Sequence, residues 1–241
     1  MSTFGVVLLA VALGDLVHGL TGEPRSRRGV AVATAIAALG AAVASAMTDQ
    51  DTVAFAGIVV LAIGIVAGWQ ELRRRDVSAA WPLTHLGVGL ALALAFDSRV
   101  DPAGGGVWEW IWEDLRVPAL GSTGDERALV VIALGLSLVA TANSVVRLVL
   151  ALDDVRVDVS SADSVKGGRV IGPIERLVIF GSLIAGAATI AGFVVAAKSL
   201  LRFPELNQKS RIHETTEYVV IGSLASWAIA LAAAVLGAGP G

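Results

Sequence analysis

The sequence feature that most constrains the fold is the repetition of long apolar runs without a charged residue. A bilayer core of roughly 30 Å is spanned by about 20 apolar residues in a helix. A soluble core could bury one such run, but it could not bury all those in this chain. The six runs are Val30–Thr48, Thr52–Gln70, Val77–Phe96, Ala128–Val146, Leu177–Ala197 and Tyr218–Gly241. The sequence therefore predicts that lipid is the solvent of this chain.

The composition is typical of a membrane protein. Hydrophobic residues make up 55% of the chain, charged residues only 16%, and the mean hydropathy is +0.75. There is no cysteine, which excludes disulfides and Cys-ligated metals. The net charge is −3, with no basic face carrying interleaved aromatic residues, so we expect no nucleic-acid partner. Ala, Gly and Val dominate the apolar positions, which favours close helix packing through small residues.

These runs predict an all-α fold, a polytopic membrane bundle of seven or eight transmembrane helices packed through small residues. We expect a single integral membrane domain over residues 1–241. Met1–Thr3 lacks the basic residues of a signal peptide, so the first apolar stretch is expected to remain as a span. The spans are expected near residues 4–20, 30–47, 52–70, 80–97, 128–150, 171–203 and 218–237.

Two arginine clusters set the expected orientation. The loop between the second and third spans, Thr48–Asp51, contains no Lys or Arg. The clusters follow the first and the third spans and consist of Arg25, Arg27 and Arg28, and of Arg73, Arg74 and Arg75. Because cytoplasmic loops are enriched in Lys and Arg, both clusters are predicted to be cytoplasmic and the N-terminus to lie outside.

The same positive-inside rule gives the expected side of the membrane for two further polar segments. The acidic segment Asp97–Arg127 is expected outside and contains the Trp-rich stretch Val107–Leu115. Trp is enriched at the level of the lipid headgroups, so this stretch is expected to form an amphipathic helix on the outer surface. A solute gate is the alternative. The polar loop Asp153–Arg169 is expected to be cytoplasmic.

The segment Ile171–Phe203 has two alternative folds. As one helix, residues 175 to 198 would cover about 35 Å, a comfortable tilted span. That arrangement puts Lys198 and Arg202 outside, against the positive-inside rule. Alternatively, the chain folds back near Gly186 into a hairpin, which places both charged ends in the cytoplasm and gives eight spans. Half-helices of about 12 residues are shorter than the bilayer core, so length favours the single span.

Ionisable residues inside apolar spans are costly and mark candidate functional positions. The first group of intramembrane polar candidates is Asp15, His18, His85, Asn143 and Arg147. Asp15 with His85 could relay protons or bind a cation; alternatively, Asp15 forms a salt bridge with Arg147 for packing alone. In either case we expect Asp15 to be shielded from lipid and paired, because an isolated carboxylate in hydrocarbon would protonate.

A second group of charges lies in the last third of the chain and consists of Glu175, Arg176, Lys198, Arg202 and Glu217. Lys198 and Arg202 are four residues apart and therefore project from one helix face. If the chain folds back, the five residues are expected to form one cytoplasmic-side cluster with one base in excess, suited to a phosphate. The alternatives are a buried network neutralised by its acids, and bases that reach the interface along their aliphatic stems.

Three motifs in the last third resemble signatures of a bacterial membrane-protein family of unknown function. They are IGxxER at Ile171–Arg176, AAKSxxRF at Ala196–Phe203 and EYxxIGS at Glu217–Ser223. The first helix of that family often carries H-x-x-x-D-x-x-x-Q, of which this chain keeps the Asp, as Asp15, and lacks both flanking polar residues. The resemblance implies a multi-pass protein of a bacterial cytoplasmic (inner) membrane, and it implies no activity.

No catalytic motif occurs in the sequence, so no catalytic residue is assigned and whether the chain is an enzyme stays open. His18, His85 and His213 lack metal-ligand spacing, so we expect neither a metal nor a cofactor. The leading hypothesis is a small-solute or ion transporter or channel. The alternatives are binding or processing of a phospho-lipid or other phosphorylated ligand at a cytoplasmic-side basic pocket, and an accessory or scaffold subunit of a membrane complex. Expected partners are membrane lipids and a second copy or another membrane subunit.

Overall fold

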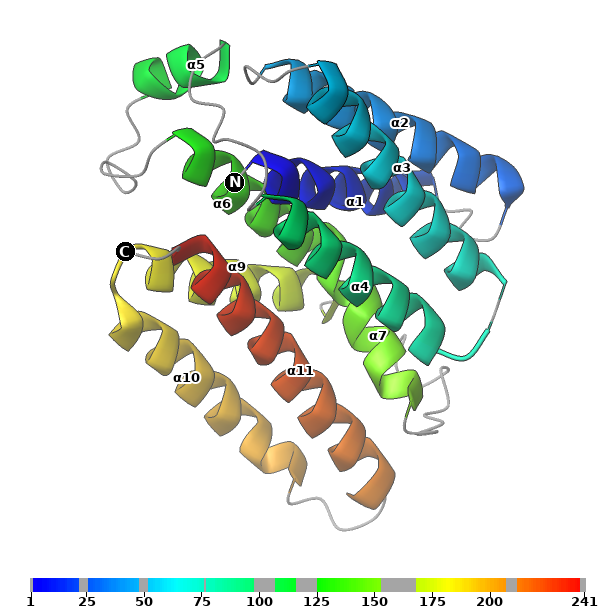
Figure 1. The fold of residues 1–241 in the computed structure, drawn as a ribbon. Helices are drawn as coiled ribbons and strands as arrows, with labels where there is room; N and C mark the ends of the chain where they lie inside the picture. The colour runs from blue at the N-terminus through cyan, green and yellow to red at the C-terminus, as the bar shows by residue number, and fades with distance from the viewer. Residues whose placement is uncertain are drawn as a thin grey trace. The chain divides into compact units, whose positions relative to one another are not determined.

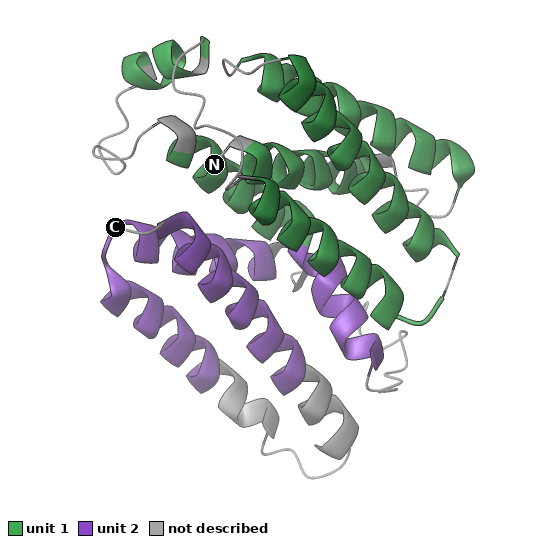
Figure 2. Ribbon diagram, in the orientation of Figure 1, with its two compact units in different colours: residues 1–141 green, residues 142–241 purple. Residues whose placement is uncertain are grey.

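The computed structural model describes residues 2–21, 26–47, 52–75, 77–97, 107–115, 125–152, 168–206 and 212–238. These residues form α-helices and connecting turns, and no strand occurs among them, so the all-α prediction is confirmed. The chain divides into two compact units, Met1–Thr141 and Ala142–Gly241 (Figures 1 and 2). The single integral membrane domain stays a prediction.

Unit 1 is built around its first helix. Helix α1 packs against α2, α3, α4 and α6, which explains why its apolar side chains are buried on nearly all sides. Phe4, Val7 and Val11 are each at most 1% exposed. The short helix α5 packs against α6. The helices of this unit are α1 (Ser2–Thr21), α2 (Arg27–Ala46), α3 (Thr52–Arg74), α4 (Ala80–Asp97), α5 (Val107–Leu115) and α6 (Asp125–Ala140).

Small residues bring α2 close to α1, as the composition predicts. A Cβ atom on Gly40 would overlap the side chain of Leu13 in α1, so only glycine fits this position without a shift. Ser26 begins the helix, and its Oγ accepts a hydrogen bond from the Gly29 amide at 2.9 Å. The buried face of α2 is a row of alanines that repeats at three- or four-residue intervals: Ala33, Ala37, Ala41 and Ala44.

The described residues of unit 2 form four helices: α7 (Ala142–Leu152), α9 (Gly168–Ile184), α10 (Ala188–Leu206) and α11 (Ile212–Ala238). Helix α9 packs against the other three. Ile179, Ala191 and Ala230 form the centre of its core, one residue from each of α9, α10 and α11. Side chains packed on this centre are Leu183, Val194, Val195 and Trp227.

The favoured expectation for residues 171–203, a single span, was wrong. Helix α9 ends at Ile184, and α10 begins at Ala188 after a turn in which Gly186 has φ +74°. This left-handed conformation suits glycine, which has no Cβ, and it ends the helix. The length argument failed because the helices extend beyond the segment, to Gly168 and to Leu206, and so have 17 and 19 residues. The chain therefore contains the hairpin.

Among the residues that the structure describes, four helices are long and apolar enough to cross a membrane: Thr3–Leu20, Arg27–Ala46, Thr52–Arg74 and Val220–Ala238. A fifth candidate is obtained if Arg127–Ala140 and Ala142–Leu152 are counted as one bent span. The break between them, at Thr141, lies inside the span expected at residues 128–150. The outward faces of α2 and α3 are apolar: Leu39 is 64% and Val53 81% exposed. Such faces suit lipid and suggest a membrane location.

Helix α5 coincides with the Trp-rich helix predicted from the sequence. Trp110 is 68% exposed, while Ile111 and Trp112 are half-buried. The acidic residues Glu109, Glu113 and Asp114 are exposed, so the helix is amphipathic. Its place on the outer surface stays a prediction. Of the polar loop expected at residues 153–169, residues 153–167 lie outside the described residues, and the last two belong to α9.

Candidate functional site

Two groups of buried charges occur in the described part of the chain, one in each unit. In unit 1, Asp15 of α1 is 5% exposed. Trp69 Nε1 donates to its two carboxylate oxygens at 3.0 and 3.1 Å. Gln70 Nε2 donates to Oδ1 at 2.9 Å, and Arg73 Nη1 donates to the same oxygen at 2.6 Å. All three donors belong to α3.

The spacing of the donors explains how one helix holds Asp15 so completely. Positions 69, 70 and 73 lie on one face of α3. The Arg73 guanidinium also lies 4.8 Å from the centroid of the Trp69 ring, a cation–π distance. Asp15 is therefore buried and paired as expected, but the base is Arg73 and not Arg147. This carboxylate joins α1 to α3 and has the environment of a structural anchor.

His85 does not form the expected relay with Asp15. Its Nε2 lies 3.1 Å from the carbonyl oxygen of Ile65, so the ring faces the backbone of α3. A Cβ atom on Gly68 would overlap this ring, which shows how closely α4 approaches α3 here. His18 is also buried, at 6% exposure. The sequence thus identified the buried Asp15 and His18 and the half-buried His85 as candidates, but not their arrangement.

In unit 2, Lys198 of α10 donates from Nζ to Glu175 Oε2 of α9, and the two form an ion pair. Both side chains are largely buried, at 13% and 15% exposure. Lys198 Nζ also lies 5.9 Å from the centroid of the Trp227 ring on α11. This contact across the hairpin is possible only because the chain turns back at Gly186: a straight helix would hold residues 175 and 198 about 35 Å apart.

Arg176, the next residue along α9, is 2% exposed and reaches the other side of the same helix. Its Nη2 donates to Asn143 Oδ1 of α7, and its Nη1 donates to Ser226 Oγ of α11 at 3.3 Å. The guanidinium thus links three helices. We name the six residues of these contacts the unit 2 network: Asn143, Glu175, Arg176, Lys198, Ser226 and Trp227.

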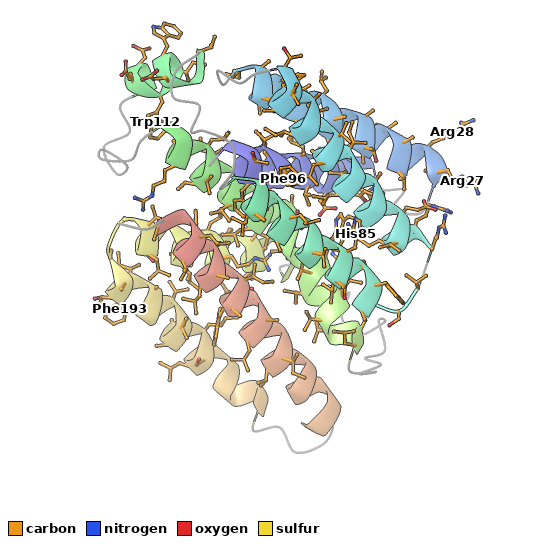
Figure 3. All side chains as sticks on the ribbon, in the orientation of Figure 1. Arg27, Arg28, His85, Phe96, Trp112 and Phe193 are labelled. Atoms are coloured by element: carbon orange, nitrogen blue, oxygen red, sulfur yellow. The ribbon has the colours of Figure 1, made fainter. Side chains whose placement is uncertain are left out.

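The network contains an unused donor and adjoins an apolar surface. Trp227 Nε1 is buried and has no hydrogen-bond acceptor among the described residues. The outer face of α10 is apolar, with Phe193 71% and Leu200 74% exposed; Figure 3 shows Phe193 projecting from this helix. Two cations and a free N–H donor give the network the chemistry of an anion site.

The structure groups the candidate residues differently from the grouping predicted from the sequence. It brings Glu175, Arg176 and Lys198 together, as the hairpin alternative requires. It adds Asn143, which was expected beside Asp15. Arg147 is exposed on α7. The side chains of Arg202 and Glu217, the other two members of the expected cluster, lie outside the described residues.

Five contact residues were missed: Trp69, Gln70, Arg73, Ser226 and Trp227. A signal was available for Arg73, because the first and third spans of an alternating bundle run parallel. Their ends therefore share one side of the membrane, where an acid in one span can meet a base in the other. No comparable signal pointed to Ser226, which is one of many small polar residues in the apolar runs.

Within the part of the chain that the structure describes, no three His, Asp or Glu side chains gather in a way that could hold a metal ion. Comparison with protein-family models, with curated proteins and with solved structures finds no match.

Proposed function

We propose that this chain is a multi-pass membrane protein that moves a small solute or ion across the membrane, with the unit 2 network as its site. The observation that carries the proposal is the position of the charges. Glu175, Arg176 and Lys198 lie near the middle of their helices rather than at the ends. Charged residues at such depth in a membrane protein are costly, and their default interpretation is a solute or ion pathway.

Interrupted helices support this proposal. The backbone breaks between α6 and α7 at Thr141 and between α9 and α10 at Gly186, and Pro173 lies inside α9. In membrane proteins, broken or shortened helices are tolerated where protein or a water-lined cavity surrounds them. Short and interrupted helices are also the usual elements of substrate sites in transporters. Asp15 of unit 1 lacks these features and is fully hydrogen-bonded.

The proposal includes eight spans. To the four helices that pass the length test and the bent pair α6–α7 counted as one span, it adds α4 and the two helices of the hairpin as shorter spans. Within unit 1, Asp15 in the second half of α1 meets Arg73 near the end of α3, so the described arginines of both clusters lie at one end of the unit. Arg27 and Arg28 project there from the start of α2 (Figure 3). We assign this end to the cytoplasm of a bacterium, with the N-terminus outside.

Flux through proteoliposomes tests the transport function. Vesicles are loaded with radiolabelled inorganic phosphate, L-lactate or rubidium, and efflux is compared with that from protein-free vesicles. We expect the wild type to release at least one of these probes. The E175Q/K198Q variant removes both charges of the ion pair together and should abolish that release. The neighbouring S199A variant, which changes an exposed hydroxyl on the same helix, should not.

Absence of flux for all three probes from folded wild-type protein contradicts transport, as does equal flux from the E175Q/K198Q variant. Folding is checked for each variant by the elution volume in detergent and by the thermal unfolding midpoint. A neutral pair in place of an ion pair leaves no buried charge behind, so this variant is expected to fold.

A second candidate is binding of a phospho-lipid headgroup. It is favoured by the closeness of Lys198 to the apolar outer face of α10, where Phe193 and Leu200 are exposed. Mass spectrometry of lipids retained during purification distinguishes this candidate. An anionic phospholipid that is retained by wild-type protein and absent from the E175Q/K198Q variant would favour it over a soluble solute.

A further inference from the structure

We infer that Lys198 binds a small monovalent carboxylate or phosphate anion in place of Glu175, and that each anion enters together with one proton. The inference deepens the transport function proposed above and rests on it. Glu175 is itself a carboxylate bound to Lys198. The ion pair therefore shows which ligand chemistry Lys198 accepts, because a small anion can replace the side-chain carboxylate without any new cation.

The exchange requires a proton because both members of the pair are largely buried. When an anion binds Lys198, the carboxylate of Glu175 loses its ion-pair partner. A largely buried carboxylate that has lost its direct ion-pair partner and lies beside a bound anion is disfavoured, and it takes up a proton on a carboxylate oxygen. Before the exchange Lys198 and Glu175 sum to zero charge. Afterwards the cation, the bound anion and the neutral acid also sum to zero.

The other charged groups on the helices packed against α9 bear on this step. Arg176 follows Glu175 on α9 and adds a second positive charge, while Arg147 on α7 is exposed. The described side chains of α11, residues 220–238, include no titratable group. The remaining titratable groups of these helices have side chains outside the described residues: Arg169, Arg202, Glu205, His213, Glu214, Glu217 and Tyr218.

Trp227 provides independent support for an absent acceptor. Its Nε1 is buried without an acceptor among the described residues, although indole N–H groups are usually paired when buried. Lys198 lies over the ring of the same tryptophan. An anion bound to Lys198 beside this ring can accept the unused N–H. The indole is then a second donor of the site, and its function explains why a polar aromatic residue lies in an apolar core.

Equilibrium binding to the full-length protein in lipid nanodiscs tests the inference. The probes are radiolabelled inorganic phosphate and L-lactate, measured from acid to alkaline pH. We expect the apparent Kd of L-lactate to rise about tenfold per pH unit, because one proton is bound with each anion. A pH-indicator dye in weakly buffered solution should report the uptake of about one proton per anion.

Three variants separate the roles of the residues. E175Q is permanently neutral at this position, so its binding of L-lactate, which carries one negative charge from weakly acidic to alkaline pH, should not change with pH and should take up no proton. The E175Q/K198Q variant should not bind either probe. W227F keeps an aromatic side chain, removes the N–H and loses part of the core packing, so it should weaken binding about tenfold and also lower the thermal unfolding midpoint. Unchanged anion binding by folded W227F would show that the N–H does not contact the anion.

The outcomes distinguish this inference from the transport function. Failure of both probes to bind folded wild-type protein overturns the anion site, and binding without proton uptake overturns the coupling. Flux that depends on Lys198 but carries no protons keeps transport and overturns the inference. Binding with proton uptake but without flux overturns transport alone. Retention of an anionic lipid that competes with phosphate would show that the site binds a lipid headgroup. It would overturn the inference that the ligand is a small soluble anion.

Discussion

Two buried carboxylates of this chain are held in different ways. Asp15 accepts hydrogen bonds from three side chains of a single helix, and each of its oxygens has at least one donor. Glu175 is paired with Lys198 across a hairpin. A carboxylate that accepts hydrogen bonds from several fixed donors cannot move away without leaving all of those donors unpaired. A carboxylate held by one flexible ammonium can exchange with another anion, and this difference is why we propose a structural role for Asp15 and a functional role for Glu175.

At this scale we predict that D15A lowers the free energy of unfolding by about 2–4 kcal/mol. The variant removes the shared acceptor of Trp69 Nε1 and Gln70 Nε2, both of which stay buried. Denaturant unfolding in detergent micelles, followed by tryptophan fluorescence, measures the change. D114A on α5 is the matched control, because that acid is exposed and should change the stability by less than about 0.5 kcal/mol. If D15A lowered the free energy of unfolding as little as D114A, the result would contradict the structural role of Asp15.

At the scale of elements, two glycines determine the packing of neighbouring segments. Gly186 gives the hairpin its left-handed turn, and Gly68 gives the His85 ring room against α3. In both cases a missing Cβ positions a whole helix rather than one side chain. Glycines elsewhere in the same helices have open space around them, for example Gly64 and Gly181. Substitutions at these positions are therefore matched controls.

We predict that G186A destabilises the protein by about 1 kcal/mol, because alanine is strained at φ +74°. G181A, in the last turn of α9 with no atom near its added Cβ, should instead stabilise the protein by about 0.5 kcal/mol through helix propensity. Thermal unfolding of the two variants side by side measures the difference. Equal effects of the same sign would mean that residue 186 is helical.

The contact between α3 and α4 gives a second prediction. G68A introduces a Cβ into the His85 ring and should destabilise the protein by about 1–3 kcal/mol, whereas G64A, one turn earlier, should not. H85A removes the ring, so the G68A/H85A double variant should recover most of the loss that G68A causes. Additive losses in this double-mutant cycle would show that the two residues are not in contact.

Much of the element level was predictable, and the reasons for the failures are physical. Apolar run length predicted α1, α2, α3 and α11, because a membrane fixes the length of a spanning helix. It misjudged the segment around Gly186, where an uncharged run hides a turn whose only signal is one glycine among alanines. The site was predictable as a set of charges but not as contacts. Which of several bases meets Asp15 depends on helix rotation, which apolar patterning alone leaves open.

At the scale of the whole molecule, the alternation of charges between spans is the main argument for orientation. In a chain without cysteine, single introduced cysteines report the side of each loop. We predict that S26C and Q50C, at opposite ends of α2, are labelled by an impermeant maleimide from opposite faces of the membrane. S26C should be protected from outside reagent and Q50C should react. Labelling of both from the same face would contradict the proposed topology.

The central claim is that the chain folds back at Gly186 and brings Lys198 to Glu175 inside a membrane. Spin labels on I174C and L200C test it most directly, because both side chains are exposed and neither belongs to the ion pair. Their separation is measured by pulsed electron paramagnetic resonance in liposomes. Packed helices are about 8–10 Å apart, so with the labels the account predicts about 15–25 Å. One straight helix would give about 39 Å or more, and that result would contradict the account.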